Sequence, residues 1–541
     1  MRKFRLASRL TALVLAALLM MSAAWAEGTE DAALQAQYDA ALQLYEAGDY
    51  AGAYEAFSAL EDFSDSRAKA GDSRRQWKAA TYKEAVSLYS KKQYAEAKTL
   101  FEELGNYEKS KSYLSTCTTQ VMRSDYLRAK ELYSNGEYAE AKELFESLGS
   151  FSDSRKRAKA ADEKLQEQLK LEAENQAYAK GLELEAAGKL AEARDSFIEA
   201  GAHEGATEKV YETARELARR SAYAKAQDYA HDGDYLSAAN WFLALGGYED
   251  SAEQAVKMQE AWQKAEYALA GENSDKAEAL AQYLALGDYE DSADKAAELK
   301  KSVTGSLVYY AAAALEEAGD LKAAQAGFEA ASYGDASERA AQVAETLKNN
   351  ATYIQAECAR MVWDLDTANA LFESLGDFSN ASVMVMPEME SITAVQLRDD
   401  NTSEKSEIFT APDGTKHQYQ IFKGVPTWRQ AQVFCELLGG HLATLTSAEE
   451  NDFVYHFMRD SGYLTAFFGL SDEARTGDWI WVTGEPFDYV NWHKNEPSRS
   501  AKERYGMYFY KHLDGTWNDS HFYETAKVDP GCSYICEWDL D

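Results

Sequence analysis

The sequence predicts a chain of two unlike parts, a long all-α region followed by a compact C-terminal domain. All six prolines lie after residue 386, and aromatic positions before that point recur every 44 residues at first and with looser spacing further on. A long stretch without proline that is rich in Ala, Glu, Leu and Lys is typical of helices, since proline breaks helices and these residues favour them. We therefore expect a helical region at residues 27–386, a linker at 387–410 and a separate domain at 411–541.

Residues 1–26 have the layout of a secretory signal peptide. Four basic residues come first, an apolar run extends from Leu10 to Met21, and Ala24-Trp25-Ala26 supplies the small residues of a cleavage site. The apolar run is shorter than an ordinary membrane span. We expect a secreted or cell-surface protein of bacterial type with no stable membrane span after cleavage. The alternative is that the segment is retained as an anchor.

The helical region is predicted to consist of helical hairpins. Tyrosines mark about eight units. They are Tyr38, Tyr82, Tyr126, Tyr178, Tyr223, Tyr267, Tyr310 and Tyr353. Within a unit, Gly48 fits the position after a helix, where a left-handed backbone is favoured. The Asp65-Ser66 pair fits a helix N-cap, and the spacing of Ala53, Phe57 and Leu60 predicts one buried helix face.

These units resemble tetratricopeptide repeats in their small residues, Gly, Tyr, Ala and Phe, although the period is about ten residues longer than that of the family. The resemblance implies a solenoid of one long and one short helix per unit. We expect the repeated aromatic residues to pack between hairpins. Between Ala160 and Ala177 the spacing stretches by about eight residues, which predicts a longer helix. The solenoid is either a stalk or adaptor, or an array whose groove binds polypeptide.

The C-terminal domain carries an ordered series of motifs. In chain order they are Trp428-Arg429-Gln430-Ala431, Cys435, Gly439-Gly440-His441-Leu442-Ala443-Thr444, Ser447 with Glu450, Phe468-Gly469-Leu470, Trp479-Ile480-Trp481-Val482, Asn491-Trp492, Glu496-Pro497, Trp517-Asn518-Asp519 and Ile535-Cys536-Glu537-Trp538. Their order and spacing, from Tyr419 to Trp538, resemble the C-type lectin-like domain. The resemblance implies an α+β domain that binds a ligand. The sequence has no motif of a serine hydrolase, zinc protease or phosphate loop, so we expect no enzymatic activity.

In lectins of this family, a Glu-Pro-Asn motif, a following Glu and an Asn-Asp pair hold a calcium ion, and two sugar hydroxyls complete its shell. The resemblance implies the calcium ligands Glu496, Glu503, Asn518 and Asp519, and a ligand-binding site that also includes Ser498. These are hard oxygen ligands of the type that calcium requires. Ser498 stands where the family has Asn, and this departure argues against a mannose-type specificity.

The family's second calcium site is expected to be lost, because only Asp472 matches a ligand, while Thr476 and Arg499 stand where acids are needed. His441 is expected to define the fold and not to bind a ligand. His493, His512 and His521 are expected near the binding face.

The resemblance also implies a disulfide between Cys435 and Cys536. The family's second disulfide is absent; Tyr505 and Phe522 stand in place of its cysteines, which predicts a packed contact. Cys532 is either a free thiol or a competitor for Cys435. Cys117 and Cys358 are expected to be small buried thiols.

The formal net charge of −35 argues against nucleic acid as a partner, because phosphate binding needs clustered Lys and Arg. Two classes of function remain. The first is calcium-assisted recognition of a glycan or cell-surface glycoprotein by the C-terminal domain, with the helices as stalk or adaptor. The second is a protein-interaction module, in which a calcium-free lectin-like domain and the solenoid both bind polypeptide.

Overall fold

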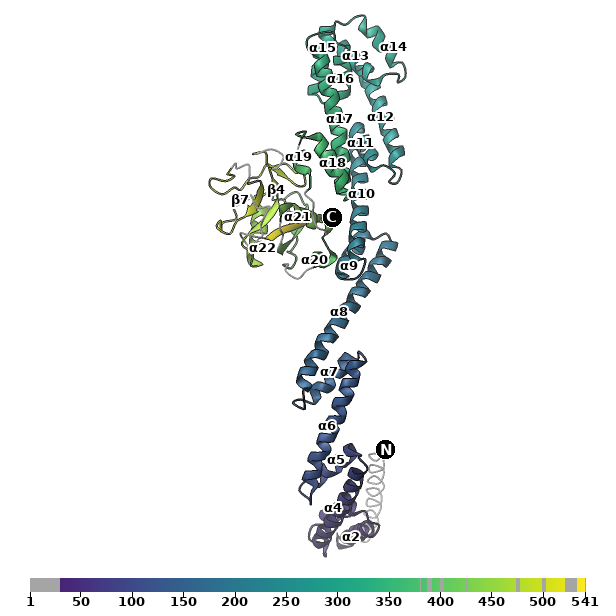
Figure 1. Ribbon diagram of the computed structural model, residues 1–541, viewed down its shortest axis with the longest axis vertical. Helices are drawn as coiled ribbons and strands as arrows, with labels where there is room; N and C mark the ends of the chain where they lie inside the picture. The colour runs from purple at the N-terminus through teal and green to yellow at the C-terminus, as the bar shows by residue number, and fades with distance from the viewer. Residues whose placement is uncertain are drawn as a thin grey trace. The chain divides into compact units, whose positions relative to one another are not determined.

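The computed structural model describes residues 30–379, 381–386, 392–398, 403–423, 427–472, 477–498, 503–520 and 533–540. It confirms the predicted fold class, a helical region followed by an α+β domain (Figure 1). The chain separates into two compact units, one ending at Lys170 and the other beginning at Leu171. Within the described part of the chain, no helix is both long and apolar enough to cross a membrane.

The first unit consists of long and short helices in alternation. They are α2 (Glu30–Glu46), α3 (Tyr50–Ala59), α4 (Ser66–Ser90), α5 (Tyr94–Leu104), α6 (Ser110–Ser134), α7 (Tyr138–Ser147) and the beginning of α8 (Ser154–Ala186). The predicted stripe is buried, since Ala53 and Phe57 are fully covered and Leu60 is 4% exposed. The long helix expected around Ala160–Ala177 is α8, which continues into the second unit.

The helix ends lie where the sequence predicts, but the carboxylate of the Asp65-Ser66 pair makes a different hydrogen bond from the one expected. Gly48 has a φ of +79°, as its position after α2 requires. Asp65 lies at the N-cap position of α4, but its side chain makes no capping hydrogen bond. It accepts a hydrogen bond from the Tyr38 hydroxyl. The predicted N-cap position of Asp65 is therefore confirmed, but its carboxylate does not cap the helix. The bond between Tyr38 and Asp65 links α2 to the start of α4, the first helix of the next hairpin.

The same Tyr–Asp bond recurs in the second unit and corrects one repeat position. The Tyr223 hydroxyl donates to Asp250 at 2.5 Å, and the Tyr309 hydroxyl donates to Asp335 at 2.7 Å. Tyr310, which the spacing indicated, is 60% exposed. The repeat tyrosine is therefore Tyr309, one residue earlier.

The helices of the second unit follow α8. They are α9 (Leu190–Glu199), α10 (Ala206–His231), α11 (Tyr235–Leu245), α12 (Ser251–Glu272), α13 (Lys276–Leu286), α14 (Ser292–Lys300), α15 (Gly305–Glu317), α16 (Leu321–Ala330), α17 (Ala336–Met361), α18 (Leu365–Leu375), α19 (Ala381–Met384) and α20 (Ala394–Arg398). The chain folds back so that α17 packs against α11 and α10 (Figure 1). Arg215 Nε donates to the Val362 carbonyl at 3.0 Å, and Cys358 shares a core cluster with Trp241.

The C-terminal domain is built on a mixed sheet flanked by two helices. Its elements are β1 (Phe409–Thr410), β2 (Lys416–Lys423), α21 (Trp428–Leu437), β3 (His441–Leu442), α22 (Ala448–Asp460), β4 (Ala466–Ser471), β5 (Ile480–Trp481), β6 (Tyr505–Tyr508), β7 (Trp517–Ser520) and β8 (Ser533–Leu540). The strand order is β1-β2-β8-β4-β6-β7, with β3 paired to β8 and β5 to β4. Only the pairing of β4 with β8 is parallel among the described strand pairs.

Most of the motif residues hold this domain together. The Trp428 indole donates to the Phe468 carbonyl at 2.8 Å, and the Trp517 indole donates to Asn451 Oδ1 at 2.6 Å. Ser447 caps α22 by accepting from the Glu450 amide. Trp428 and Trp517 are 2% and 0% exposed, so these two tryptophans belong to the core.

In the second unit, the C-terminal domain shares a core with the helices. Val433 and Leu437 of α21 belong to one cluster with Phe197 of α9 and Leu397 of α20. Arg360 of α17 pairs with Glu436 at 3.1 Å. The interval expected as a linker thus contributes a helix, α20, that packs on α9 and α10.

Candidate functional site

The residues expected to bind calcium come from two segments. Glu496 and Ser498 follow Trp492, which pairs with Trp517 at the start of β7, and Asn518 and Asp519 lie within β7. The Glu496 amide donates to the His493 carbonyl at 2.9 Å, and the Glu496–Pro497 peptide bond is cis. The His493 amide donates to the Trp517 carbonyl at 2.9 Å, which holds the loop against β7, and Glu496 and Ser498 lie beside Asp519.

Ser498 links the carboxylates of this group. Its amide donates to Asp519 Oδ2 at 2.8 Å, and its hydroxyl donates to the same oxygen at 2.9 Å. The hydroxyl is also within hydrogen-bonding distance of Glu503 Oε2. Asn518 donates its side-chain amide to the Asp519 carbonyl, which leaves its own Oδ1 as a ligand oxygen. Glu496, Ser498, Glu503 and Asp519 are thus brought to one place, and Asn518 precedes Asp519 in β7.

Negative charge is concentrated here. Burial, together with the hydrogen bond and charge of Asp519, raises the pKa of Glu496 to about 7. Asp519 is 1% exposed, and its Oδ1 has no hydrogen-bond partner among the described residues. A buried carboxylate oxygen without a donor is costly unless a cation or proton neutralises it. The residues therefore fit a calcium ion, which takes oxygen ligands from carboxylates and side-chain amides.

Asp472, the remaining residue of the second calcium site, is also buried. It is 1% exposed; Oδ2 accepts from the Gly477 amide at 2.8 Å, and Oδ1 has no hydrogen-bond partner within the described ranges. Burial raises the pKa of this carboxyl, and the charge of Asp519 adds to the effect. Thr476 and Arg499 lie outside the described residues.

Two of the three histidines expected near this face stack on each other. The rings of His493 and His512 are 3.6 Å apart at their centroids and 11° from parallel. His493 Nδ1 contacts Thr516 Oγ1 at 2.8 Å. Burial and the neighbouring His493 lower the pKa of His512. His521 lies outside the described residues.

The two cysteines expected to form a disulfide are neighbouring buried thiols in this structure. Cys435 and Cys536 are both 0% exposed and belong to one core cluster. Burial, and then the neighbouring Cys536, raises the pKa of Cys435. The disulfide stays a prediction. Burial also raises the pKa of Cys117 and that of Cys358, the latter to about 11.

Tyr505 packs against Trp428. The two rings are stacked, with centroids 5.0 Å apart. Phe522 and Cys532 lie outside the described residues, so the expected Tyr505–Phe522 contact and the role of Cys532 stay predictions.

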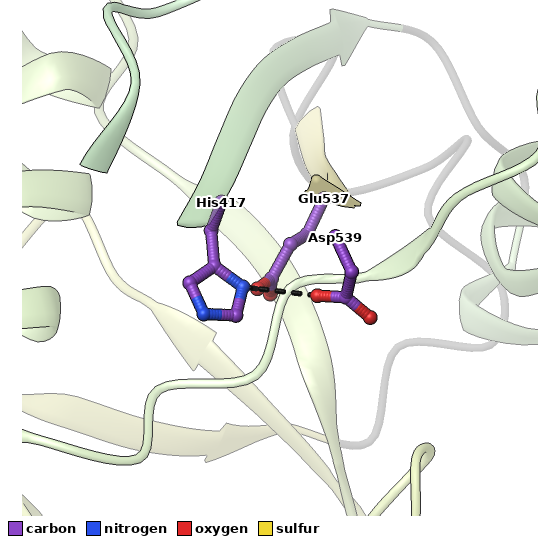
Figure 2. A group of neighbouring side chains, drawn as sticks. All are labelled: His417, Glu537 and Asp539. Carbon is purple, nitrogen blue, oxygen red and sulfur yellow. Dashed lines mark hydrogen bonds and ion pairs between the residues drawn. The ribbon is translucent and has the colours of Figure 1, made fainter. Parts of the chain in front are cut away.

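Sequence reasoning missed a second group of titratable side chains on β2 and β8. His417 Nδ1 lies 2.7 Å from Glu537 Oε1 and 2.9 Å from Asp539 Oδ1 (Figure 2). The hydrogen bond to Glu537 raises the pKa of His417 to about 9. The alternation of Glu537 and Asp539 in the last strand was a visible signal, but the strand opposite it could not be identified from the sequence.

Comparison with known proteins identifies the C-terminal part. The family model of the lectin C-type domain matches residues 425–537. C-type lectin domain family 4 member D of Homo sapiens is 37% identical over 95 residues, which cover 17% of this chain and 43% of that protein. A lectin of Pleurodeles waltl is 30% identical over 124 residues, which cover 22% of this chain and 69% of that protein. The match thus spans less than half the length of the human relative.

A solved structure is similar over the same part. It is the C-type carbohydrate-recognition domain of cow CD23, crystallised in the presence of a GlcNAc2Man3 oligosaccharide. It is 28% identical, and the match covers 24% of this chain and 98% of that chain with a TM-score of 0.20. On the family match and the identity to the Pleurodeles waltl lectin, the chain belongs to the C-type lectin domain family.

Proposed function

We propose that the C-terminal domain binds carbohydrate with the help of a calcium ion held by Glu496, Glu503, Asn518 and Asp519. The helical repeats serve as its stalk or adaptor in a secreted or cell-surface protein that is not an enzyme. One observation carries the proposal. Asp519 is buried with an unpartnered oxygen beside Glu496, whose pKa is raised to about 7.

The protein supplies only part of a calcium shell. Three carboxylates and one amide oxygen are fewer than the six to eight oxygens that calcium takes. A bound calcium ion would leave positions for two hydroxyl groups of a sugar. Ser498 holds Asp519 and Glu503 through its short hydroxyl, where a longer amide side chain would reach further towards a ligand. We therefore place the ligand among glycans, in agreement with the lectin relatives, without the mannose-type contact that an Asn at this position provides.

Calcium should stabilise the domain by mass action. Extracellular calcium modules have dissociation constants of about 10⁻⁴–10⁻³ M. At about 10 mM calcium, a site in this range stabilises the folded domain by roughly 1.4–2.7 kcal/mol. The full chain should therefore melt at a higher temperature in calcium than in chelator, and a glycan array should show binding only in calcium.

The variants Glu496→Gln and Asp519→Asn remove one charge each with little change of shape. Both should abolish the calcium-dependent shift and the glycan signal together. Glu485→Gln is the matched control, because Glu485 is an exposed carboxylate between β5 and Trp492 that accepts a hydrogen bond from Thr483 and lies outside the calcium group. If the wild-type protein melts at the same temperature in calcium and in chelator, carbohydrate binding through a calcium ion is refuted.

A second candidate function is binding of polypeptide by the helical region. It is favoured by a cavity of about 320 Å³ between α11, α12, α16 and α17. Leu243 and Val256 on its rim are each 59% exposed. A peptide library displayed on phage and selected on the full chain tests it. Peptides whose binding survives in Leu243→Glu would count against this groove.

A further inference from the structure

Strand register brings four potential metal ligands to one face of the sheet. Glu537 and Asp539 are two residues apart in β8, so their side chains point to the same face. His417 of β2 is the register partner of Asp539, and His441 of β3 is the register partner of Glu537. Directly paired residues share a face of a sheet. Figure 2 shows His417, Glu537 and Asp539 converging from these strands.

The ligand atoms of three of these side chains are spaced much as in a coordination shell. One ligand atom from each of His417, Glu537 and Asp539 lies within 4.8 Å of the others. His441 Nε2 lies 3.3 Å from the second oxygen of Asp539. Around a tetrahedral zinc ion with bonds near 2.0–2.1 Å, neighbouring ligand atoms are roughly 3.3 Å apart. The 2.7 and 2.9 Å contacts of His417 therefore need to widen by only a few tenths of an ångström.

The ring nitrogens of His417 and His441 that face away from the carboxylates make hydrogen bonds of their own. These bonds orient both imidazoles towards the carboxylates. His441 Nδ1 lies 2.9 Å from the Leu442 carbonyl oxygen, which can only accept, so Nδ1 carries a proton and Nε2 faces Asp539. Thr415 Oγ1 donates to Asp413 at 2.7 Å and is 3.0 Å from His417 Nε2. It therefore accepts from His417 Nε2–H, and Nδ1 faces the carboxylates. Such second hydrogen bonds are the rule for histidines that bind metals.

The carboxylates are also fixed. Glu537 is 0% exposed, and its Oε2 accepts from the Thr444 amide at 2.8 Å. Glu450, 2% exposed, accepts from the Tyr419 hydroxyl at 2.7 Å and adds a second buried acid nearby. Buried acids this close need a neutralising positive charge, which the protonated His417 supplies until a metal ion takes its place. Asp539, with a side chain 66% exposed, leaves the cluster open to ions from solvent.

We propose that His417, Glu537 and Asp539 bind a transition-metal ion of the zinc class, and that His441, for which the sequence indicated only a role in the fold, moves in as the fourth ligand. Two imidazole nitrogens and two carboxylate oxygens suit zinc, whereas calcium takes oxygen ligands. Binding places the ion on His417 Nδ1 and His441 Nε2 in exchange for the protons there, which leave to solvent. The site is built from β2, β3 and β8, and it shares no residue with the group around Asp519.

Cobalt tests the site directly, because a cobalt(II) ion bound tetrahedrally absorbs visible light. Full-length protein stripped with chelator should bind one equivalent of cobalt with such a spectrum, and one equivalent of zinc should abolish it. Asp539→Asn and His417→Gln should each weaken cobalt binding by at least about tenfold. His441→Ala should weaken it too, and Glu496→Gln should leave it unchanged.

His456→Gln is the matched control. His456 faces Asp452 at 3.3 Å on the surface of α22, so it is a His–Asp pair outside the cluster. Circular dichroism establishes that each variant is folded. If His417→Gln fails to fold, Asp539→Asn still tests the site, because it alters an exposed side chain. The proposal is overturned if the stripped protein binds no cobalt or if Asp539→Asn leaves the cobalt spectrum intact. It is also overturned if calcium, and not zinc, stabilises the protein and variants of the His417 group abolish that stabilisation.

Discussion

Glu266 is a buried acid whose ionisation should limit the stability of the helical region. It lies on α12 and is 7% exposed. Its Oε1 has no hydrogen-bond partner within the described part of the chain. Burial, followed by the charge and hydrogen bond of Asp320, raises its pKa to about 7. Asp320 itself caps α16 by accepting from the Ala323 amide. The change to make is Glu266→Gln, which keeps the shape and removes the charge.

The folded protein holds the Glu266 proton more tightly than the unfolded chain, where the pKa is 4.5. The resulting stability is therefore fully present below about pH 4.5 and is lost as the pH rises towards 7. A difference of about 2.5 pKa units corresponds to roughly 3 kcal/mol. Glu266→Gln should stabilise the protein by up to that amount at pH 8 and by little at pH 4.5.

Thermal unfolding followed by circular dichroism at the two pH values measures this difference, and hydrogen exchange in α12 and α16 locates it. Glu260→Gln, on the exposed side of the same helix, is the control and should show no such dependence on pH. An equal gain for Glu266→Gln at pH 4.5 and pH 8 would refute the reasoning, because it would show that the benefit does not arise from removing an ionised carboxylate.

Two further predictions concern the repeats and the cysteines. Tyr309→Phe removes the bond to Asp335 and should cost about 1 kcal/mol in unfolding free energy, whereas the neighbouring Tyr310→Phe should cost a few tenths; equal losses in denaturant titration would contradict the corrected repeat position. Cys435 and Cys536 should be joined in exported protein, closing a loop of about 100 residues and adding up to roughly 4–5 kcal/mol; a Cys435–Cys532 peptide in non-reduced mass mapping would contradict the pairing.

Local patterns predicted the elements of this fold well. The repeat spacing identified buried helix faces because Phe57, Phe101 and Phe145 fill the same place in successive hairpins. The motif series identified the C-terminal domain because its tryptophans form the core. The spacing failed where a neighbouring residue could replace the expected one, as Tyr309 does for Tyr310. It also failed for the Asp65 carboxylate, which could accept a hydrogen bond either from the amides of its own helix or from a nearby hydroxyl, and accepts one from Tyr38.

Contacts between distant segments were not predictable from the sequence. The packing of α17 on α10 and α11 and the pair of Arg360 with Glu436 join residues that share no local pattern. The position of Val433 and Leu437 against Phe197 is of the same kind. Helical periodicity predicts which face of a helix is apolar, but it does not predict which other helix or domain packs against that face.

The site residues divide in the same way. The five residues around Asp519 could be named because family motifs place them, although the sequence did not indicate that Asp519 Oδ1 is buried without a partner. The His417 group depends on strand pairing alone. Glu537 and Asp539 face one side of β8 by alternation, but only the register with β2 and β3 brings two imidazoles to them.

The chemistry of the two clusters makes their proposed ions separable. Glu496, Glu503, Asn518 and Asp519 offer oxygen atoms alone, while the His417 group offers nitrogen and oxygen. Calcium discriminates against nitrogen, and zinc favours it. Variants at Asp519 should therefore alter the response to calcium and leave that to zinc intact, and variants at Asp539 should do the reverse. A single variant that abolished both responses would mean that the two clusters are not independent, and the two assignments would have to be abandoned together.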